Sequence, residues 1–141
     1  MEIDHIGIAC SNLEVSINHY LKLGFKIKKE KITDFGRNLN YVFLENDGYK
    51  LELISKFRES EKSDIDVILS DKKLLGNKIY HICYISNDLL KDMEILQATG
   101  YKVLKEPSTA IACDNKRVVF LMHFELGIVE LLENGTNDAL E

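Results

Sequence analysis

Long apolar runs and an excess of basic residues are both missing from this sequence of 141 residues. No stretch approaches the roughly 18 continuous apolar residues that mark a membrane-spanning helix, and no signal-like apolar segment opens the chain. We therefore expect a protein that neither spans a membrane nor is secreted. The formal net charge of −5 argues against nucleic acid as a partner, because neutralising phosphates requires a basic surface.

Cysteine is scarce as well, with three residues in no C-x-x-C pair: Cys10, Cys83 and Cys113. An odd number of widely spaced cysteines is typical of reduced thiols, which predicts a cytoplasmic protein without a disulfide framework. A chain of this length can bury a sufficient hydrophobic core without a disulfide or a structural metal.

The sequence contains an internal repeat. The segment DHIGIACSNLEVSINHYLKLGFKI, from Asp4, aligns without a gap with YHICYISNDLLKDMEILQATGYKV, from Tyr80, at an offset of 76 residues. Two later matches keep nearly the same offset: VFL at 42–44 with VFL at 119–121, and LELI at 51–54 with VELL at 129–132. An ordered series of matches at an almost constant offset predicts the duplication of one folding unit.

Each copy is predicted to follow the order βαβββ. In the first copy, a helix with Leu13, Ile17, Tyr20 and Leu21 on one face begins after Ser11 or Asn12 and ends at Gly24. In the second copy, a helix with Leu89, Met93 and Leu96 on one face begins after Asn87 or Asp88 and ends at Gly100. The predicted strands are Ile3–Cys10, Phe25–Ile32, Leu39–Glu45, Tyr49–Ser55, Ile79–Ser86, Tyr101–Lys105, Arg117–His123 and Ile128–Glu133. The turn Asn46-Asp47-Gly48 joins two of them as a hairpin.

The predicted fold class is α+β, with two βαβββ repeats forming a curved mixed sheet around a metal-binding cleft. We expect one domain over residues 1–141, made of modules at about 2–56 and 79–133 and a linker at 57–78. The linker is predicted to contain a helix within Asp64–Leu75, Pro107 to mark a loop or an edge, and residues 134–141 to form a frayed tail. The lysine-rich stretch Lys26–Lys31 is predicted to be the solvated side of a strand.

Histidine and glutamate occur at matching places in the two copies. Because side chains alternate along a strand, His5 and Glu52 should face away from the apolar neighbours that cover the helix, and the second copy repeats this pattern. A pseudo-twofold axis would bring four such side chains together, and burying them without partners would be costly. Two imidazoles and two carboxylates suit a divalent Zn, Ni, Co, Mn or Fe ion. The predicted metal ligands are His5, Glu52, His81 and Glu130.

The duplication, with DHIGIA opening one copy and HICY the other, resembles the vicinal oxygen chelate superfamily, which includes glyoxalase I, methylmalonyl-CoA epimerase, extradiol dioxygenases and bleomycin-resistance proteins. This resemblance covers roughly Glu2 to Glu133 and implies the same four ligands. It also implies a lyase or isomerase that transfers a proton next to a metal-polarised carbonyl, a small carbonyl or thioester substrate, and a homodimer. Glu130 is the first candidate for the base and Glu52 the second. The epimerases use an additional glutamate, and the corresponding segment, Asp34–Asn38, contains none.

Two other functions stay open. A bleomycin-resistance-like protein would bind a small molecule without metal, and an extradiol-type dioxygenase would activate oxygen with two histidines and one carboxylate. Among single residues, Cys83 is predicted to be a small apolar wall residue and His123 a surface residue. Arg37 and Arg117 are candidates for holding an anionic group of a substrate, and Arg117 is the better of the two.

Overall fold

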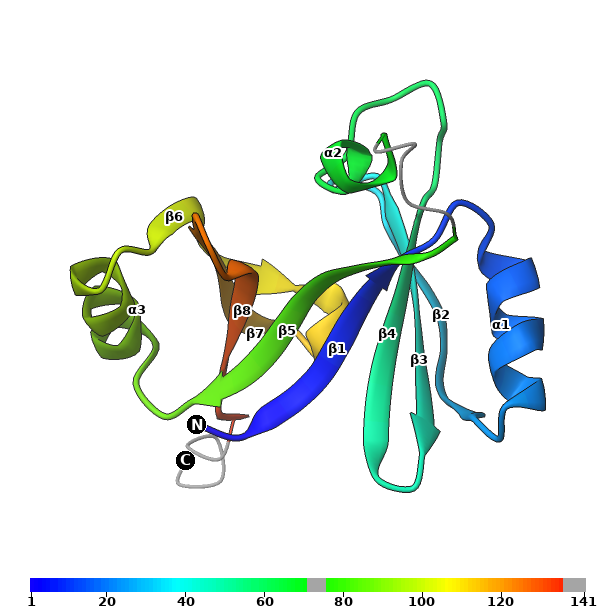
Figure 1. Cartoon of the computed structure of the whole chain (residues 1–141), viewed down its shortest axis with the longest axis horizontal. Coiled ribbons are helices and arrows are strands. Elements are labelled where there is room, and N and C mark those ends of the chain that lie inside the picture. Colours follow the sequence, from blue (N-terminus) through cyan, green and yellow to red (C-terminus); the bar gives the residue numbers. More distant parts are fainter. Residues whose placement is uncertain (71–75, 136–141) are drawn as a thin grey trace. The chain divides into compact units, whose positions relative to one another are not determined.

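The computed structural model describes residues 1–70 and 76–135. Module 1, residues 2–56, contains one helix and four strands: β1 (Ile3–Ala9), α1 (Leu13–Lys22), β2 (Lys26–Asp34), β3 (Leu39–Asn46) and β4 (Tyr49–Lys56). Module 2, residues 78–133, repeats this order: β5 (Lys78–Ser86), α3 (Leu89–Ala98), β6 (Lys102–Ala110), β7 (Lys116–His123) and β8 (Gly127–Glu133). The predicted α+β class with two βαβββ repeats is confirmed (Figure 1).

The two modules have the same strand pairing. In module 1 the order is β2-β3-β4-β1, with β1 and β4 parallel and the other pairs antiparallel. In module 2 the order β6-β7-β8-β5 has the same directions. Even the register repeats, because Gly7 is opposite Glu52 in the first parallel pair and Cys83 is opposite Glu130 in the second. The structure therefore supports the duplication that the sequence predicts.

The chain divides into two compact units whose boundaries fall within strands. One unit holds His5–Tyr80, and the other holds Met1–Asp4 together with the described residues from His81 onward. The segment between the modules thus belongs to the same unit as most of module 1. The expectation that both modules form one domain stays a prediction. Within the parts of the chain that the structure describes, no helix is long and apolar enough to cross a membrane.

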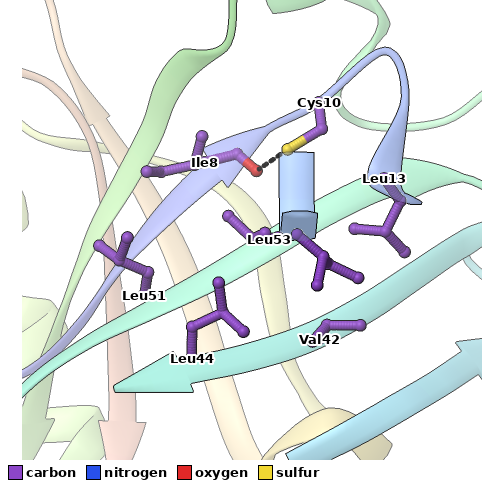
Figure 2. Packing of buried hydrophobic residues seen from close by; sticks show 8 residues of the cluster. Ile8, Cys10, Leu13, Val42, Leu44, Leu51 and Leu53 are labelled. Carbon is purple, nitrogen blue, oxygen red and sulfur yellow. Dashed lines mark hydrogen bonds between the residues drawn. The ribbon is translucent and has the colours of Figure 1, made fainter. Parts of the chain in front are cut away.

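The core of module 1 lies between α1 and one face of its sheet (Figure 2). Its buried members are Ile8, Cys10, Leu13, Ile17, Val42, Leu44, Leu51 and Leu53. The predicted helix stripe is confirmed at Leu13 and Ile17, and Tyr20 packs against the cluster, but Leu21 is 40% exposed. With 3.6 residues per turn, Leu21 lies about 80° around the helix from Leu13, at the edge of the stripe. The Asn12 side chain accepts a hydrogen bond from the Val15 N–H, which identifies the helix cap.

The core of module 2 is built in the same way. Leu89 of α3 packs on buried residues of β7 and β8, and Met93 and Leu96 complete the helix stripe. The buried strand residues are Val119, Leu121, Val129 and Leu131. Asp88, one of the two predicted caps, accepts a hydrogen bond from the Lys91 N–H. In both modules one face of the sheet is therefore occupied by the helix.

Two predicted elements have different bounds in the structure. Strand β6 runs to Ala110 instead of ending at Lys105, because two register shifts against β7 let the strand continue through Pro107. Pro107 thus lies in an edge strand. Of the two predicted alternatives, a loop or an edge, the edge is confirmed. The linker helix α2 covers only Asp66–Leu69, and its predicted continuation through 71–75 lies outside the described residues, as do residues 136–141 of the predicted tail.

The core packing of module 1 predicts which leucine contributes most to the stability of the fold. Leu53 is fully buried in the cluster, so Leu53→Ala should lower the free energy of unfolding by about 2–5 kcal/mol. Leu23, which is 70% exposed, provides the matched control, and Leu23→Ala should stay within about 0.5 kcal/mol of the parent protein. Urea unfolding followed by circular dichroism measures both values, and equal losses for the two variants would contradict this assignment of the core.

Candidate functional site

A histidine and a glutamate meet on adjacent parallel strands of module 1. His5 lies on β1 and Glu52 on β4, and their Nε2 and Oε1 atoms are 3.3 Å apart. Both residues are almost fully buried, at 1% and 3% exposure. The neighbours Leu51 and Leu53 belong to the helix-covered core, so Glu52 projects from the opposite face of the sheet. The predicted separation of the polar pair from the apolar core is confirmed in this module.

Module 2 holds the equivalent pair. His81 lies on β5 and Glu130 on β8, with 3.1 Å between Nε2 and Oε1. Both residues are again buried, and Val129 and Leu131 on either side of Glu130 belong to the core under α3. Each module therefore presents one imidazole and one carboxylate on the sheet face that its helix does not cover.

An aromatic ring supports each histidine, and sequence reasoning did not assign this role. The rings of Phe43 and His5 meet edge to face, with 5.3 Å between centroids and an interplanar angle of 86°. Phe120 contacts His81 in the same way, at 5.4 Å and 77°. Phe43 is opposite Glu52 in the strand register, as Phe120 is opposite Glu130. The repeated VFL tripeptide could have indicated this role, because its phenylalanine occupies the equivalent strand position in both copies.

The spacing within each pair suits two neighbouring ligands of one metal ion. Imidazole nitrogen and carboxylate oxygen bind first-row divalent ions at about 2.1 Å, so two ligands at angles of 90° to 109° lie about 3.0–3.4 Å apart. The observed separations of 3.3 Å and 3.1 Å fall in this range. Burial and the aromatic contact also restrict the imidazole to one orientation. Each pair can thus supply half of a four-ligand site.

Three other predicted residues have structural partners. Arg117 donates from its backbone N–H to Glu133 at 2.7 Å and from Nε at 3.0 Å, so an ion pair explains it without a substrate. His123 accepts a hydrogen bond from the Glu125 N–H and packs its ring against Tyr101. Cys83 is fully buried opposite Glu130 in the strand register, in agreement with a small wall residue.

The turn that lacks the additional glutamate of the epimerases is held by its own side chains. The Asp34 carboxylate accepts a hydrogen bond from the Arg37 N–H at 3.0 Å and lies 3.5 Å from Arg37 Nε. The next residue, Asn38, accepts from the Arg58 N–H and donates to three carbonyl oxygens of residues 58–62. The one carboxylate of this turn is therefore used in shaping it.

The sequence and the fold of the chain are similar to those of known proteins. The family model of the glyoxalase/bleomycin resistance protein/dioxygenase superfamily matches residues 4–120. No curated protein matches the sequence.

Solved structures with a similar fold include several methylmalonyl-CoA epimerases. The enzyme from Mycobacterium tuberculosis is 23% identical, with a TM-score of 0.76 over 99% of this chain and 91% of that chain. A variant of the Streptomyces coelicolor enzyme in complex with 2-nitronate-propionyl-CoA is 25% identical, with a TM-score of 0.77 over 96% of each chain. A hypothetical protein from Bacillus halodurans is 22% identical, with a TM-score of 0.79 over 94% of each chain. At these identities, the similarity shows a shared fold.

The contact between Arg117 and Glu133 predicts how the free energy of unfolding depends on pH. The Arg117 backbone hydrogen bond and then its guanidinium lower the pKa of the Glu133 carboxyl. A carboxyl whose pKa is lower in the folded state stabilises the fold above its unfolded pKa, and this contribution disappears as the pH falls through the folded pKa. Glu133→Gln should therefore lower the free energy of unfolding by up to about 1 kcal/mol at pH 7, with no difference at strongly acidic pH.

Chemical unfolding at a series of pH values measures this effect. Glu125→Gln is the matched control, because Glu125 is an exposed residue of the turn before β8. A destabilisation by Glu133→Gln that is the same at every pH would show that the ion pair is not its cause.

Proposed function

Because the chain belongs to the glyoxalase/bleomycin resistance protein/dioxygenase superfamily, we propose that it is a metal-dependent lyase or isomerase that moves a proton next to a carbonyl group. The observation that carries this proposal is the recurrence of one buried His–Glu pair, with the same spacing and the same aromatic support, in both modules. The proposed metal ligands are His5, Glu52, His81 and Glu130. The proposed ion is divalent, and Zn, Ni, Co, Mn and Fe all accept this ligand set.

The need for two modules follows from the number of ligands. A stable transition-metal site requires at least three or four protein ligands, and each module contributes only two. Two such pairs complete a four-ligand set and leave coordination positions for a substrate if the ion is octahedral. Phe43 and Phe120 would act as positioning residues, since each fixes the plane of a ligand imidazole.

The chemistry requires a Lewis acid and a base. When bound, a divalent ion supplies the Lewis acid for a carbonyl oxygen, which makes the adjacent C–H acidic. In this proposal, Glu130 accepts that proton on a carboxylate oxygen and returns it, with Glu52 as the second candidate. The turn 34–38 contains no glutamate for this role, so the proposal assigns the base to the two His–Glu pairs. The similar epimerases were solved with acyl-CoA compounds, which favours a thioester as the carbonyl substrate.

Metal binding provides the first test of this proposal. We expect about one divalent ion per chain, and His5→Gln and His81→Gln should each lower metal affinity by more than about 100-fold, since loss of a ligand exceeds the loss of a supporting residue. Elemental analysis and calorimetric titration measure stoichiometry and affinity. His19→Gln, an exposed histidine of α1, is the control and should leave both unchanged.

Two outcomes would contradict a shared site. Binding of two ions, each abolished by only one of the variants, would show two independent pairs, and the absence of any metal would favour a metal-free binding protein. A mixture of His5→Gln and His81→Gln chains also tests the expected homodimer. Recovery of metal binding in the mixture would mean that the two pairs come from different chains, whereas continued loss would place both in one chain.

Proton transfer provides the second test. Deuterium from solvent should enter the carbon next to the carbonyl of methylmalonyl-CoA or of a hemithioacetal, as followed by proton NMR. Glu130→Gln should lower the exchange rate by about 10²–10⁴-fold, because a positioned base contributes a factor of this size. The amide keeps an oxygen ligand, so metal content should change less than the rate.

Glu125→Gln is the control for this experiment as well and should exchange at the parent rate. An unchanged rate in Glu130→Gln together with a large loss in Glu52→Gln would transfer the role of base to module 1. Oxygen consumption with catechols, and no exchange with any carbonyl substrate, would replace the proposal with a dioxygenase.

A further inference from the structure

The segment that follows β4 lies on the sheet face of module 1 that carries Glu52. Because side chains alternate along β4, Lys56 points to the same side of the sheet as Glu52. The Lys56 ammonium forms an ion pair with Asp66 of α2 at 2.9 Å, and only 11% of the Lys56 side chain is exposed. Figure 1 shows α1 and α2 on opposite sides of β3 and β4. Residues 57–69, the strap, therefore cover the Lys56 end of this face.

The part of the face between Glu52 and Lys56 is buried although α1 does not cover it. Ile54 is 1% exposed, and Tyr41, its partner in the strand register, is 7% exposed. Neither residue belongs to the hydrophobic cluster under α1, which occupies the other face. Ile65, the strap residue before α2, is itself fully buried. The strap thus contributes an apolar side chain to the protein interior as well as an ion pair.

One buried side chain, that of Asn38, holds the first half of the strap. Its oxygen accepts a hydrogen bond from the Arg58 N–H at 2.7 Å, and its amide donates to the carbonyl oxygens of Arg58 and Glu61 at 2.9 Å and 3.1 Å. The Phe57 N–H donates to the Asn38 carbonyl oxygen at 3.1 Å, and the rings of Phe35 and Phe57 meet edge to face. Removal of the Asn38 side chain would therefore release several strap contacts at once.

The second half of the strap is held by polar side chains as well. Besides its ion pair with Asp66, Lys56 donates to the Glu59 carbonyl oxygen at 3.2 Å. Asp66 also accepts hydrogen bonds from the N–H and the hydroxyl of Ser63. The helix α2 has only four residues and no side-chain cap. Because these contacts lie outside the core under α1, the strap is able to open locally while the module stays folded.

The duplication shows that the turn before β3 does not need the strap. Asn115 of module 2 corresponds to Asn38 at the repeat offset of 77, and both residues have a left-handed backbone, with φ of 62° and 58°. Asn38 is 4% exposed, whereas Asn115 is exposed. The repeat places Asn134 where module 1 has Lys56, and the Asn134 amide donates to Asn87 at 2.8 Å. The strap contacts are thus specific to module 1.

We propose that the strap is a gate, a segment that covers the face of the His5–Glu52 pair and opens to admit a substrate. His5 and Glu52 are 1% and 3% exposed, so a substrate reaches them only when part of the cover moves. The strap provides this movement because side-chain contacts hold it, whereas strand pairing and the core hold the sheet. This inference rests on the proposed function, since the gate controls entry to that same site.

Chemical labelling of histidine tests the gate without metal and without a substrate. Diethyl pyrocarbonate reacts with accessible imidazoles, and peptide mass spectrometry of chelator-treated protein gives the rate at each histidine. In the parent protein, His5 should react much more slowly than the exposed His19. Asn38→Gly removes the side chain and keeps a residue that adopts the left-handed backbone. It should speed the reaction of His5 at least about tenfold, because the loss of several hydrogen bonds raises the population of the open strap.

Matched controls come from the other module and from the same sheet. Asn115→Gly makes the same change at the equivalent turn, and His5 should react in it as in the parent protein. Lys56→Met releases the second half of the strap and decides the question if Asn38→Gly does not fold. Its control is Lys28→Met, which removes a substantially exposed ion pair with Glu45 and should leave the rate at His5 unchanged.

Amide hydrogen exchange on the same samples shows whether the strap itself opens. Exchange in residues 57–69 should become faster in Asn38→Gly and Lys56→Met, while the amides of β3 and β4 keep the parent rate. Faster exchange in the strap with an unchanged reaction at His5 would overturn the inference, because the strap would then open without exposing the pair. Unchanged exchange in both variants would overturn it too, as would a parent protein in which His5 reacts as fast as His19.

Metal uptake by the parent protein distinguishes this inference from the proposed function. Strap-dependent labelling of His5 in a chain that binds no metal would leave the gate standing and remove the metal-dependent function. Normal metal uptake without strap-dependent labelling would do the reverse.

Discussion

The alternation of side chains along β1 and β4 is the constraint on which both the core and the candidate site of module 1 depend. Leu51 and Leu53 pack under α1, and Glu52 between them faces the other side of the sheet beside His5. A shift of one residue in the parallel register would put Glu52 into the core and leucines on the site face. The packing that stabilises the module therefore also positions the ligands. Module 2 obeys the same constraint through Val129, Glu130 and Leu131.

Duplication explains why a symmetrical set of side chains can serve an asymmetrical reaction. The repeated register keeps His, Glu and Phe in the same relation in both modules, so the ligand geometry is inherited with the fold. Residues that are neither packed in the core nor members of the ligand set are able to diverge between the two copies. Lys50 and Ile128 occupy such a position, next to the site but outside the His–Glu–Phe set. The ligand geometry is thus the same in both modules, whereas positions outside the His–Glu–Phe set differ between them.

The sequence predicted those features that depend on local periodicity or on the repeat. Caps, helix stripes and the two His–Glu pairs fall in this class, because each follows from spacing within one element or from the comparison of two copies. Features that depend on contacts between strands were missed. Strand β6 passes through Pro107 because bulges against β7 absorb the irregularity, and no property of the segment alone indicates this. Phe43 likewise acquires its contact with His5 from the cross-strand register.

The two modules also differ beside their carboxylates. In module 1, Phe43 is opposite Glu52 in the register, and the ammonium groups of Lys29 and Lys50 lie 5.4 Å and 5.8 Å from the centroid of its ring. In module 2, Phe120 is opposite Glu130, and Ile128 stands at the position that corresponds to Lys50. The repeated register therefore preserves the His–Glu–Phe set, while the residues around it give the two pairs unequal surroundings. Two pairs of the same geometry need not have the same function, because the side chains beside them differ.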